Sequence, residues 1–290
     1  MKICLSCKKS ISGSVWKCPS CGWHPAEQEG VCLFAEHITG PDEGYDPQWY
    51  NELANLEGGN FWFNARNRLI CWIAMRHLPL KAEYLEIGCG TGFVLQMLRK
   101  QFPDWKIQAT EAHAEGLAFA RARVGIDVVF SQMDARAIPF RDEFDVIGAF
   151  DVIEHIKEDE KVLNEIYAAL KPKGFFLLSV PQHMFLWSRY DEVGCHFRRY
   201  SLTELTSKLQ KAGFGIVETT SFNSLLLPLM LLSRLGKRDS TKHIDVLDEL
   251  RLPNWLNKIL SGVLWLEFVL SRIGVRWPVG GSRIVLARKI

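Results

Sequence analysis

The chain has 290 residues, 48% of them hydrophobic and 23% charged, with a formal net charge of +2 at pH 7. This length favours one large domain with additions, and the ordinary composition excludes a chain that is disordered over long stretches. The charge is close to zero, so a polyanionic partner has no general support and nucleic acid is not favoured.

Two Cys-x2-Cys pairs, ten residues apart, form the first motif of the chain. In a reducing compartment such pairs bind a metal more often than they form disulfides. Four thiolates give a tetrahedral site with no open position, so we predict a structural Zn²⁺ in a zinc ribbon over residues 1–24. Four unrelated buried cysteines are the alternative, but so short and polar a stretch cannot build a core unaided. The predicted ligands are Cys4, Cys7, Cys18 and Cys21.

The chain begins without an apolar stretch followed by small residues, so we expect no secretory signal and a cytoplasmic location. Residues 25–47 carry several glycines and prolines among polar residues, and we interpret them as a linker. The main domain is then expected over residues 48–290.

Hydrophobic periodicity first predicts two helices, over residues 49–56 and 61–78. The strands and helices that alternate after them predict an α/β fold with a doubly wound, mostly parallel, Rossmann-like sheet. Ligands of such sheets bind beyond the carboxyl ends of the strands. The predicted strands are 84–87, 106–110, 128–130, 144–150, 175–180, 214–219 and 282–287, and the predicted helices between them are 93–100, 114–124, 158–170 and 203–212.

A glycine-rich turn, EIGCGTG from Glu86 to Gly92, joins the first of these strands to a helix. Glycines there let the backbone approach a ligand closely, and the start of the helix offers free amides. The turn therefore fits a nucleotide-type cofactor. A nicotinamide-binding fingerprint would have Gly or Ala at the next position, where this chain has Phe93.

The pattern E-x-G-x-G-x-G resembles the first motif of class I S-adenosylmethionine-dependent methyltransferases, and the resemblance extends over about residues 60 to 220. It implies that Glu111, at the end of the second strand, accepts the ribose hydroxyls of the cofactor. It also implies that Asp134, after the third strand, holds the adenine amino group. The implied cofactor-binding residues are Glu86, Gly88, Cys89, Gly90, Thr91, Gly92, Glu111, Ala112, Asp134, Ala135 and Phe150.

Methyl transfer needs alignment of the acceptor and exclusion of water, and a hydroxyl acceptor must also lose its proton. His155, just past the fourth strand, is the predicted base; its alternative role is to pack or cap at a helix start. Asp151, Glu154, His155 and His196 together resemble an arrangement in some O-methyltransferases acting on RNA 3′ ends and quinone precursors. That resemblance implies a divalent ion such as Mg²⁺, although Asp151 stands where those relatives usually carry Glu.

The acceptor is less well defined by the sequence. Residues 61–66 (FWFNAR) and 196–201 (HFRRYS) resemble a subgroup of bacterial methyltransferases associated with surface glycans, lipids and small metabolites. We therefore predict O-methylation of a small-molecule, glycan or lipid-linked acceptor. The oligomeric state is left open. Arg198 and Arg199 would either grip an acidic group or form a solvated pair.

Two other functions stay open at this point. An RNA methyltransferase could bind nucleic acid through the zinc ribbon, although the near-neutral charge argues mildly against it. A non-catalytic cofactor-binding protein is the other alternative, and the intact glycine motif argues against that.

Residues 225–277 form a hydrophobic helical insertion between the last two predicted strands. It consists of an apolar run, a charged stretch and a helical segment whose apolar face is interrupted by charges, Glu267 among them. Neither apolar part has the roughly 18 uncharged residues that a membrane span needs. The insertion is either a cap packed over the active site or a hairpin resting on the inner face of a membrane. In the second case Lys237, Arg238 and Lys242 would lie near the headgroups.

Overall fold

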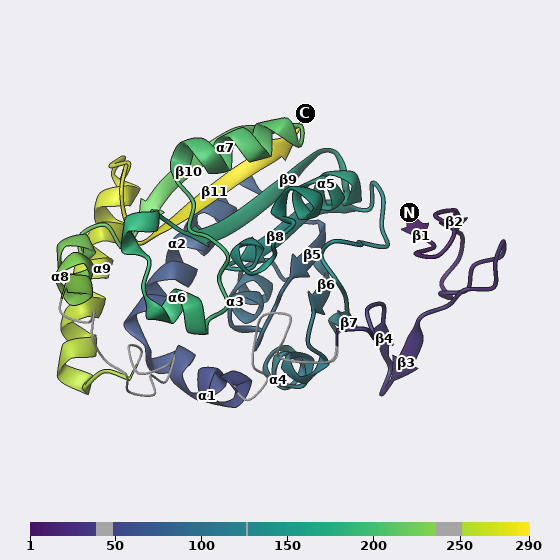
Figure 1. Ribbon diagram of the computed structural model, residues 1–290, viewed down its shortest axis with the longest axis horizontal. Helices are drawn as coiled ribbons and strands as arrows, with labels where there is room; N and C mark the ends of the chain where they lie inside the picture. The colour runs from purple at the N-terminus through teal and green to yellow at the C-terminus, as the bar shows by residue number, and fades with distance from the viewer. Residues whose placement is uncertain (39–48, 126, 236–250) are drawn as a thin grey trace.

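The computed structural model describes residues 1–38, 49–125, 127–235 and 251–290. A large sheet forms its centre, with helices on both faces (Figure 1). The N-terminal cysteine segment lies at one end of the molecule. Helices α8 (Leu227–Leu235) and α9 (Asn254–Arg272) lie at the other end.

The central sheet has nine strands within these residues. From β9 to β4 neighbouring strands are parallel, whereas β11 runs antiparallel to both of its neighbours. The order reverses at β5, which makes the sheet doubly wound and confirms the predicted fold class. In spatial order the strands are β10 (Phe214–Phe222), β11 (Ser282–Lys289), β9 (Leu170–Pro181), β8 (Phe144–Phe150), β5 (Glu83–Ile87), β6 (Lys106–Glu111), β7 (Val129–Gln132), β4 (Val31–Leu33) and β3 (Ala26–Gln28).

Two hydrophobic cores hold the layers together. One lies between the sheet and α2, α3, α4 and α9, and the other between the sheet and α5 and α7. Besides α8 and α9, the helices are α1 (Trp49–Leu56), α2 (Phe61–His77), α3 (Phe93–Gln101), α4 (Ala114–Val124), α5 (Asp159–Ala169), α6 (Arg189–Val193) and α7 (Leu202–Lys211), with short 3₁₀ segments η2 (Glu57–Gly59), η3 (Ile153–His155) and η4 (Met184–Leu186).

The predicted bounds differ most from the observed ones at β9. This strand begins at Leu170 rather than at residue 175, because the Lys-Pro-Lys-Gly sequence that follows Leu170 continues the strand instead of forming a turn. Leu170 still pairs with Phe144 of β8, and a register shift before Val146 absorbs the irregularity.

Part of the segment predicted as a linker extends the central sheet. Strands β3 and β4 form an antiparallel hairpin, and β4 pairs in parallel with β7. Each strand has only three residues, which is too short to produce a recognisable period in the sequence. Residues 39–47 of the predicted linker lie outside the described residues. A separate two-stranded ribbon, β1 (Lys2–Ile3) and β2 (Ser10–Ile11), precedes the hairpin.

The C-terminal insertion packs along α2. Leu260 and Leu264 of α9 are buried. The ring of Phe268 lies edge-on to that of Trp72 of α2, with 6.1 Å between the ring centroids. Glu267 lies on the same buried face of α9 as Leu260 and Leu264, so it interrupts the apolar face as predicted. It is 2% exposed and accepts hydrogen bonds from two backbone amides between β10 and α8. In the part of the chain that the structure describes, no helix is long and apolar enough to cross a membrane.

Candidate active site

The glycine-rich turn between β5 and α3 needs its glycines for different reasons. All three have positive φ angles, +66° at Gly88, +52° at Gly90 and +77° at Gly92. A Cβ at Gly88 would lie 2.5 Å from the Val152 side chain, and one at Gly92 would lie 3.0 Å from the Ala120 backbone. A Cβ at Gly90 would have no described atom within 4 Å. Gly88 and Gly92 are therefore needed for packing, while Gly90 faces open space that a ligand can use.

Glu111 lies beside this turn, at the carboxyl end of β6. One carboxylate oxygen accepts a hydrogen bond from the Gly90 amide at 2.8 Å, and the other accepts from the Ala112 amide at 2.8 Å. The tertiary fold thus brings the two predicted cofactor-binding elements into direct contact. A carboxylate keeps further acceptor capacity after these bonds, so ribose binding by Glu111 stays a compatible prediction.

Glu86 lies in β5, at the start of the glycine-rich motif, and is 1% exposed. Its carboxyl group accepts a hydrogen bond from the Tyr84 hydroxyl at 2.7 Å. Burial raises the pKa of Glu86 to about 8, although the Tyr84 hydroxyl and the charge of Arg66 act to lower it. The carboxyl is therefore mostly protonated at neutral pH, and an incoming cation would favour its ionised form.

Thr91 connects the turn to the helices that precede the sheet. Its hydroxyl donates to the Glu57 carboxylate at 2.5 Å, and Arg123 of α4 donates to the same carboxylate at 2.6 Å. The Arg123 guanidinium also contacts the Thr91 hydroxyl at 2.8 Å. Glu57 and Arg123 thus fix the far side of the turn, and the sequence analysis missed both residues.

The predicted adenine-binding residues follow β7. Asp134 is held by Arg136, whose Nε lies 3.0 Å from its carboxylate, and by the Arg136 amide at 2.7 Å. His37, from the segment after β4, lies 3.8 Å from the same carboxylate. Ala135 and Phe150 are buried. These residues lie at the carboxyl edge of the sheet with the turn, and their contacts to a cofactor stay predictions.

Asp151 follows β8 with a left-handed backbone, φ +56°. Its carboxylate is paired with Arg66 of α2 and accepts a hydrogen bond from Ser179 of β9 at 3.0 Å. It lies outside the group of potential metal ligands described next. Asp151 therefore joins α2 to the sheet, and the predicted four-residue metal set loses this member.

Glu154, His155 and His196 form a cluster beside the carboxyl ends of β8 and β9. Their ligand atoms all lie within 4.8 Å of one another, and the two imidazole rings meet edge to face at 4.6 Å between centroids. Both carboxylate oxygens of Glu154 and Nδ1 of His155 are buried without a hydrogen-bond partner. Such unsatisfied polar atoms are costly, so the cluster is suited to receive a proton, a substrate group or a metal ion.

The charge states of the cluster follow from its burial. Burial, and after it the neighbouring Asp151 carboxylate, raise the pKa of Glu154 well above its usual value, which favours the protonated form. Burial, with a contribution from nearby His196, lowers the pKa of His155 to about 3. His155 is therefore neutral at physiological pH and can act as a base or a ligand without first losing a proton.

Asp191 orients the third member of the cluster. One carboxylate oxygen lies 2.9 Å from His196 Nδ1 and accepts from Arg199 Nε at 2.7 Å. Burial alone would raise the pKa of Asp191, but the bond with His196 and the Arg199 charge outweigh it and lower the pKa to about 2. Because Nδ1 is engaged by Asp191, Nε2 is the ring nitrogen of His196 that would serve as a ligand. A capping box between Ser188 and Asp191 at the start of α6 was the sequence signal that could have revealed the acid.

Both predicted roles of Arg198 and Arg199 are wrong. Arg199 is 8% exposed and bound to Asp191, and Arg198 forms an ion pair with Asp159 at 2.6 Å. Neither arginine is a solvated surface residue, and neither has a free guanidinium for a substrate. They pair inside the molecule because α6 presents Asp191, eight residues before Arg199, and α5 presents Asp159, which is distant from Arg198 in the sequence.

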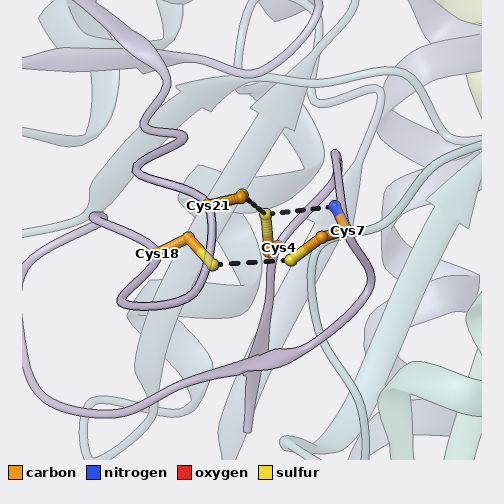
Figure 2. Close-up of side chains that lie close together, drawn as sticks. All are labelled: Cys4, Cys7, Cys18 and Cys21. Carbon is orange, nitrogen blue, oxygen red and sulfur yellow. Dashed lines mark hydrogen bonds between the residues drawn. The ribbon is translucent and has the colours of Figure 1, made fainter.

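The four cysteines of the two Cys-x2-Cys pairs come together in the N-terminal segment (Figure 2). The Sγ atoms of Cys4 and Cys21 lie 3.6 Å apart, as do those of Cys7 and Cys18. In a tetrahedral site with Zn–S bonds of about 2.3 Å, the sulfur atoms are about 3.8 Å apart. The arrangement therefore has the geometry of a closed four-thiolate site.

Comparison with known proteins identifies the family to which the chain belongs. The model of a methyltransferase domain family matches residues 60–219, which is more than half of the chain and includes the turn, Glu111, Asp134 and His155. The chain belongs to this family of methyltransferases. The predicted enzyme class and S-adenosylmethionine as cofactor are thereby confirmed.

The individual relatives share less than a third of their residues with this methyltransferase over the matched part. A Mycolicibacterium smegmatis protein named "Probable S-adenosylmethionine-dependent methyltransferase" is 28% identical over 174 residues, 58% of this chain and 64% of that protein. The malonyl-[acyl-carrier protein] O-methyltransferase of Bacillus cereus is 28% identical over 116 residues, 40% of this chain and 42% of that protein. The chain thus spans less than two thirds of the length of these curated relatives.

A solved structure supports the fold alone. Phosphoethanolamine N-methyltransferase 2 of Haemonchus contortus, in complex with S-adenosyl-L-methionine, superposes with a TM-score of 0.51 at 21% sequence identity. The match covers 76% of this methyltransferase and 52% of the other chain.

Proposed function

We propose that this methyltransferase transfers the cofactor methyl group to an oxygen atom of a small-molecule, glycan or lipid-linked acceptor. The observation that carries the proposal is the neutral His155 imidazole, whose Nδ1 is buried without a partner at the carboxyl edge of the sheet. A hydroxyl acceptor must lose its proton as its oxygen attacks the sulfonium methyl. The neutral imidazole with its unpartnered nitrogen is available to accept that proton, although its pKa of about 3 makes it a weaker base than an exposed histidine. The Bacillus cereus relative is an O-methyltransferase, which supports an oxygen acceptor here. The proposal concerns the acceptor atom and does not extend to that relative's own substrate.

The test uses purified protein with radiolabelled S-adenosylmethionine and separate lipid, glycan, small-phenolic and RNA fractions. We expect label in one of the first three fractions and a product whose new methyl group is on oxygen by mass spectrometry. Label confined to RNA, or a product methylated on nitrogen, would contradict the proposal.

A metal-assisted reaction is the second candidate, favoured by the unsatisfied atoms of Glu154 and His155. Together with His196 they would hold a divalent ion, and a bound ion would lower the pKa of an acceptor hydroxyl. Two imidazoles and one carboxylate suit Mn²⁺ or another transition metal better than the predicted Mg²⁺, which prefers oxygen ligands. In this case Asp191 would still orient His196, and Arg66 would hold Asp151 away from the ion.

We also propose that the four N-terminal cysteines bind a structural Zn²⁺. The sulfur separations fit a tetrahedral site, and four protein ligands leave no position for a substrate. Cys4 and Cys18 are buried with Ile11 as the small core of this segment. A core of this size cannot hold the segment folded unaided, so a metal has a clear structural task here.

The outer face of α9 supports a peripheral contact with an anionic membrane. Apolar side chains on it are 49% to 64% exposed, among them Trp255, Trp265 and Leu266, and Ile273 directly after the helix is 75% exposed. The exposed charges of the helix, Lys258 and Arg272, are basic, and its one acid is the buried Glu267. An apolar helix face with only basic charges is complementary to a lipid surface that carries anionic headgroups.

A cavity at the end of α9 adds to this surface. Its volume is about 410 Å³, and Trp72, Arg76, Arg272 and Arg276 lie in its wall. Arg76 and Arg276 share a single acid, Glu218 of β10. Arg272 adds a third guanidinium to the wall, so the cavity carries net positive charge next to the exposed Ile273, where a lipid phosphate would be accommodated. A lipid-linked acceptor would then be concentrated near the enzyme.

A further inference from the structure

We propose that the N-terminal cysteine module, residues 1–38, holds the adenine side of the cofactor site in place, so that its metal and S-adenosylmethionine bind cooperatively. The proposal rests on the Zn²⁺ proposed above and on the cofactor of the family. The feature that carries it is the path of the chain after β7, which lies between the module and the sheet.

The first contact is made by β4, the last strand of the module. β4 pairs in parallel with β7 through Cys32 and Leu33, and the Phe34 amide then donates to the Gln132 carbonyl at 2.9 Å. The next residue of the chain, Met133, donates from its amide to the Glu111 carbonyl at 3.0 Å. The end of β7 is therefore bonded to the module on one side and to the predicted ribose-binding residue on the other.

Gln132 links the same elements through its side chain, which is 4% exposed. Its amide nitrogen donates to the Ala35 carbonyl at 2.9 Å and to the Ala112 carbonyl at 3.0 Å. Ala35 belongs to the module, and Ala112 directly follows Glu111. His37 of the module also lies 3.8 Å from the carboxylate of Asp134. Gln132 is thus a positioning residue between the module and both carboxylates predicted to hold the nucleoside.

The module also contacts the distal part of the same loop. The Ile3 amide donates to the Pro139 carbonyl at 2.9 Å, and Lys2 pairs with Phe140 in an isolated β-bridge. Trp16, which lies between Cys7 and Cys18, packs edge-on against Phe140 at 5.4 Å. Residues 132–140 are therefore bounded at both ends by module residues. Their conformation depends on the folded state of the module, and so on the metal that stabilises it.

Coupling of this kind is reciprocal. If loss of the metal weakens cofactor binding by some factor, the bound cofactor must strengthen metal binding by the same factor. We expect a factor of about ten or more, which corresponds to about 1.4 kcal/mol.

The experiment measures S-adenosylhomocysteine binding by calorimetry in metal-loaded and chelator-stripped protein after metal content has been determined. We expect the dissociation constant to rise about tenfold or more on stripping and to recover when Zn²⁺ is returned. Cys21→Ser should reproduce the loss, since Cys21 is exposed and its replacement opens no cavity. Lys9→Ser is the control, because it changes an exposed side chain of the same module that lies outside both the cysteine cluster and the pairing of β4 with β7.

A second measurement on wild-type protein covers the case in which stripped protein unfolds. Zn²⁺ affinity is measured by competition with a chromogenic chelator, with and without saturating S-adenosylhomocysteine, and we expect it to rise by the same factor with the ligand. Gln132→Met should weaken S-adenosylhomocysteine binding while the zinc content stays at one per chain. Protein without bound metal would refute the zinc assignment itself. Zinc-loaded protein whose two affinities are independent would overturn the coupling alone.

Discussion

The Glu111 carboxylate accepts a hydrogen bond from the Gly90 amide at 2.8 Å, which joins the acid at the end of β6 to the one glycine of the turn that faces open space. A side chain at Gly90 would fill the space left for the cofactor and would be strained at φ +52°. We expect Gly90→Val to weaken S-adenosylmethionine binding by about a hundredfold or more, and Glu111→Ala by about tenfold to a hundredfold through lost charge-assisted hydrogen bonds.

Calorimetry measures both affinities. Gly274→Val is a matched control, because Gly274 also has a positive φ, +108°, and open space around its Cβ position, but lies at the end of α9. Unchanged affinity in folded Gly90→Val and Glu111→Ala would place the cofactor elsewhere.

Glu86 should make cofactor binding release a proton. The pKa of this buried carboxyl is about 8 in the free protein, above its usual value, so most of it is protonated at pH 7. The ammonium group of the cofactor would favour the carboxylate and lower that pKa. We expect close to one proton to be released per cofactor bound at pH 7 and none in Glu86→Gln. Calorimetry in buffers with different ionisation enthalpies counts the protons, and equal counts in both proteins would refute a role for Glu86.

His155 should act as the base without a catalytic metal. We expect activity to persist in a chelator that leaves the N-terminal zinc bound, and His155→Ala to lower kcat by about a hundredfold to ten-thousandfold. The pKa of His155 is lowered from 6.5 to about 3, so its base form predominates throughout the neutral range. The rate should then show no inflection near pH 6.5. Activity abolished by the chelator and restored by Mn²⁺ would instead support the metal-assisted reaction.

The outer face of α9 should bind anionic vesicles at low salt. In a flotation assay we expect the wild-type protein to rise with vesicles that contain phosphatidylglycerol and to remain below with phosphatidylcholine alone. The double variant Trp265→Glu and Leu266→Glu should lose this binding, because it places two acids in the apolar face. Leu80→Glu is the control, since Leu80 is 78% exposed and lies away from α9. Wild-type protein that stays below with both vesicles would leave α9 as a packed cap only.

The sequence by itself determined the elements whose signal is local. Strand β8 has the predicted bounds because it is a short, nearly continuous apolar run, and α4 has them because Gly125, with its positive φ, follows its last residue. The glycine turn was located because positive φ angles favour glycine. The four cysteines could likewise be grouped in advance, since their spacing is a property of two short turns.

Only the tertiary structure decided which charged and short elements meet. Arg66 pairs with Asp151 across 85 positions of sequence, and Asp191 orients His196 from a helix that the sequence analysis did not predict. The segment read as a linker became strands β3 and β4 because the exposed edge of β7 supplied the missing hydrogen bonds. Ion pairs and edge pairings depend on distances between elements, and a local sequence pattern carries no information about those distances.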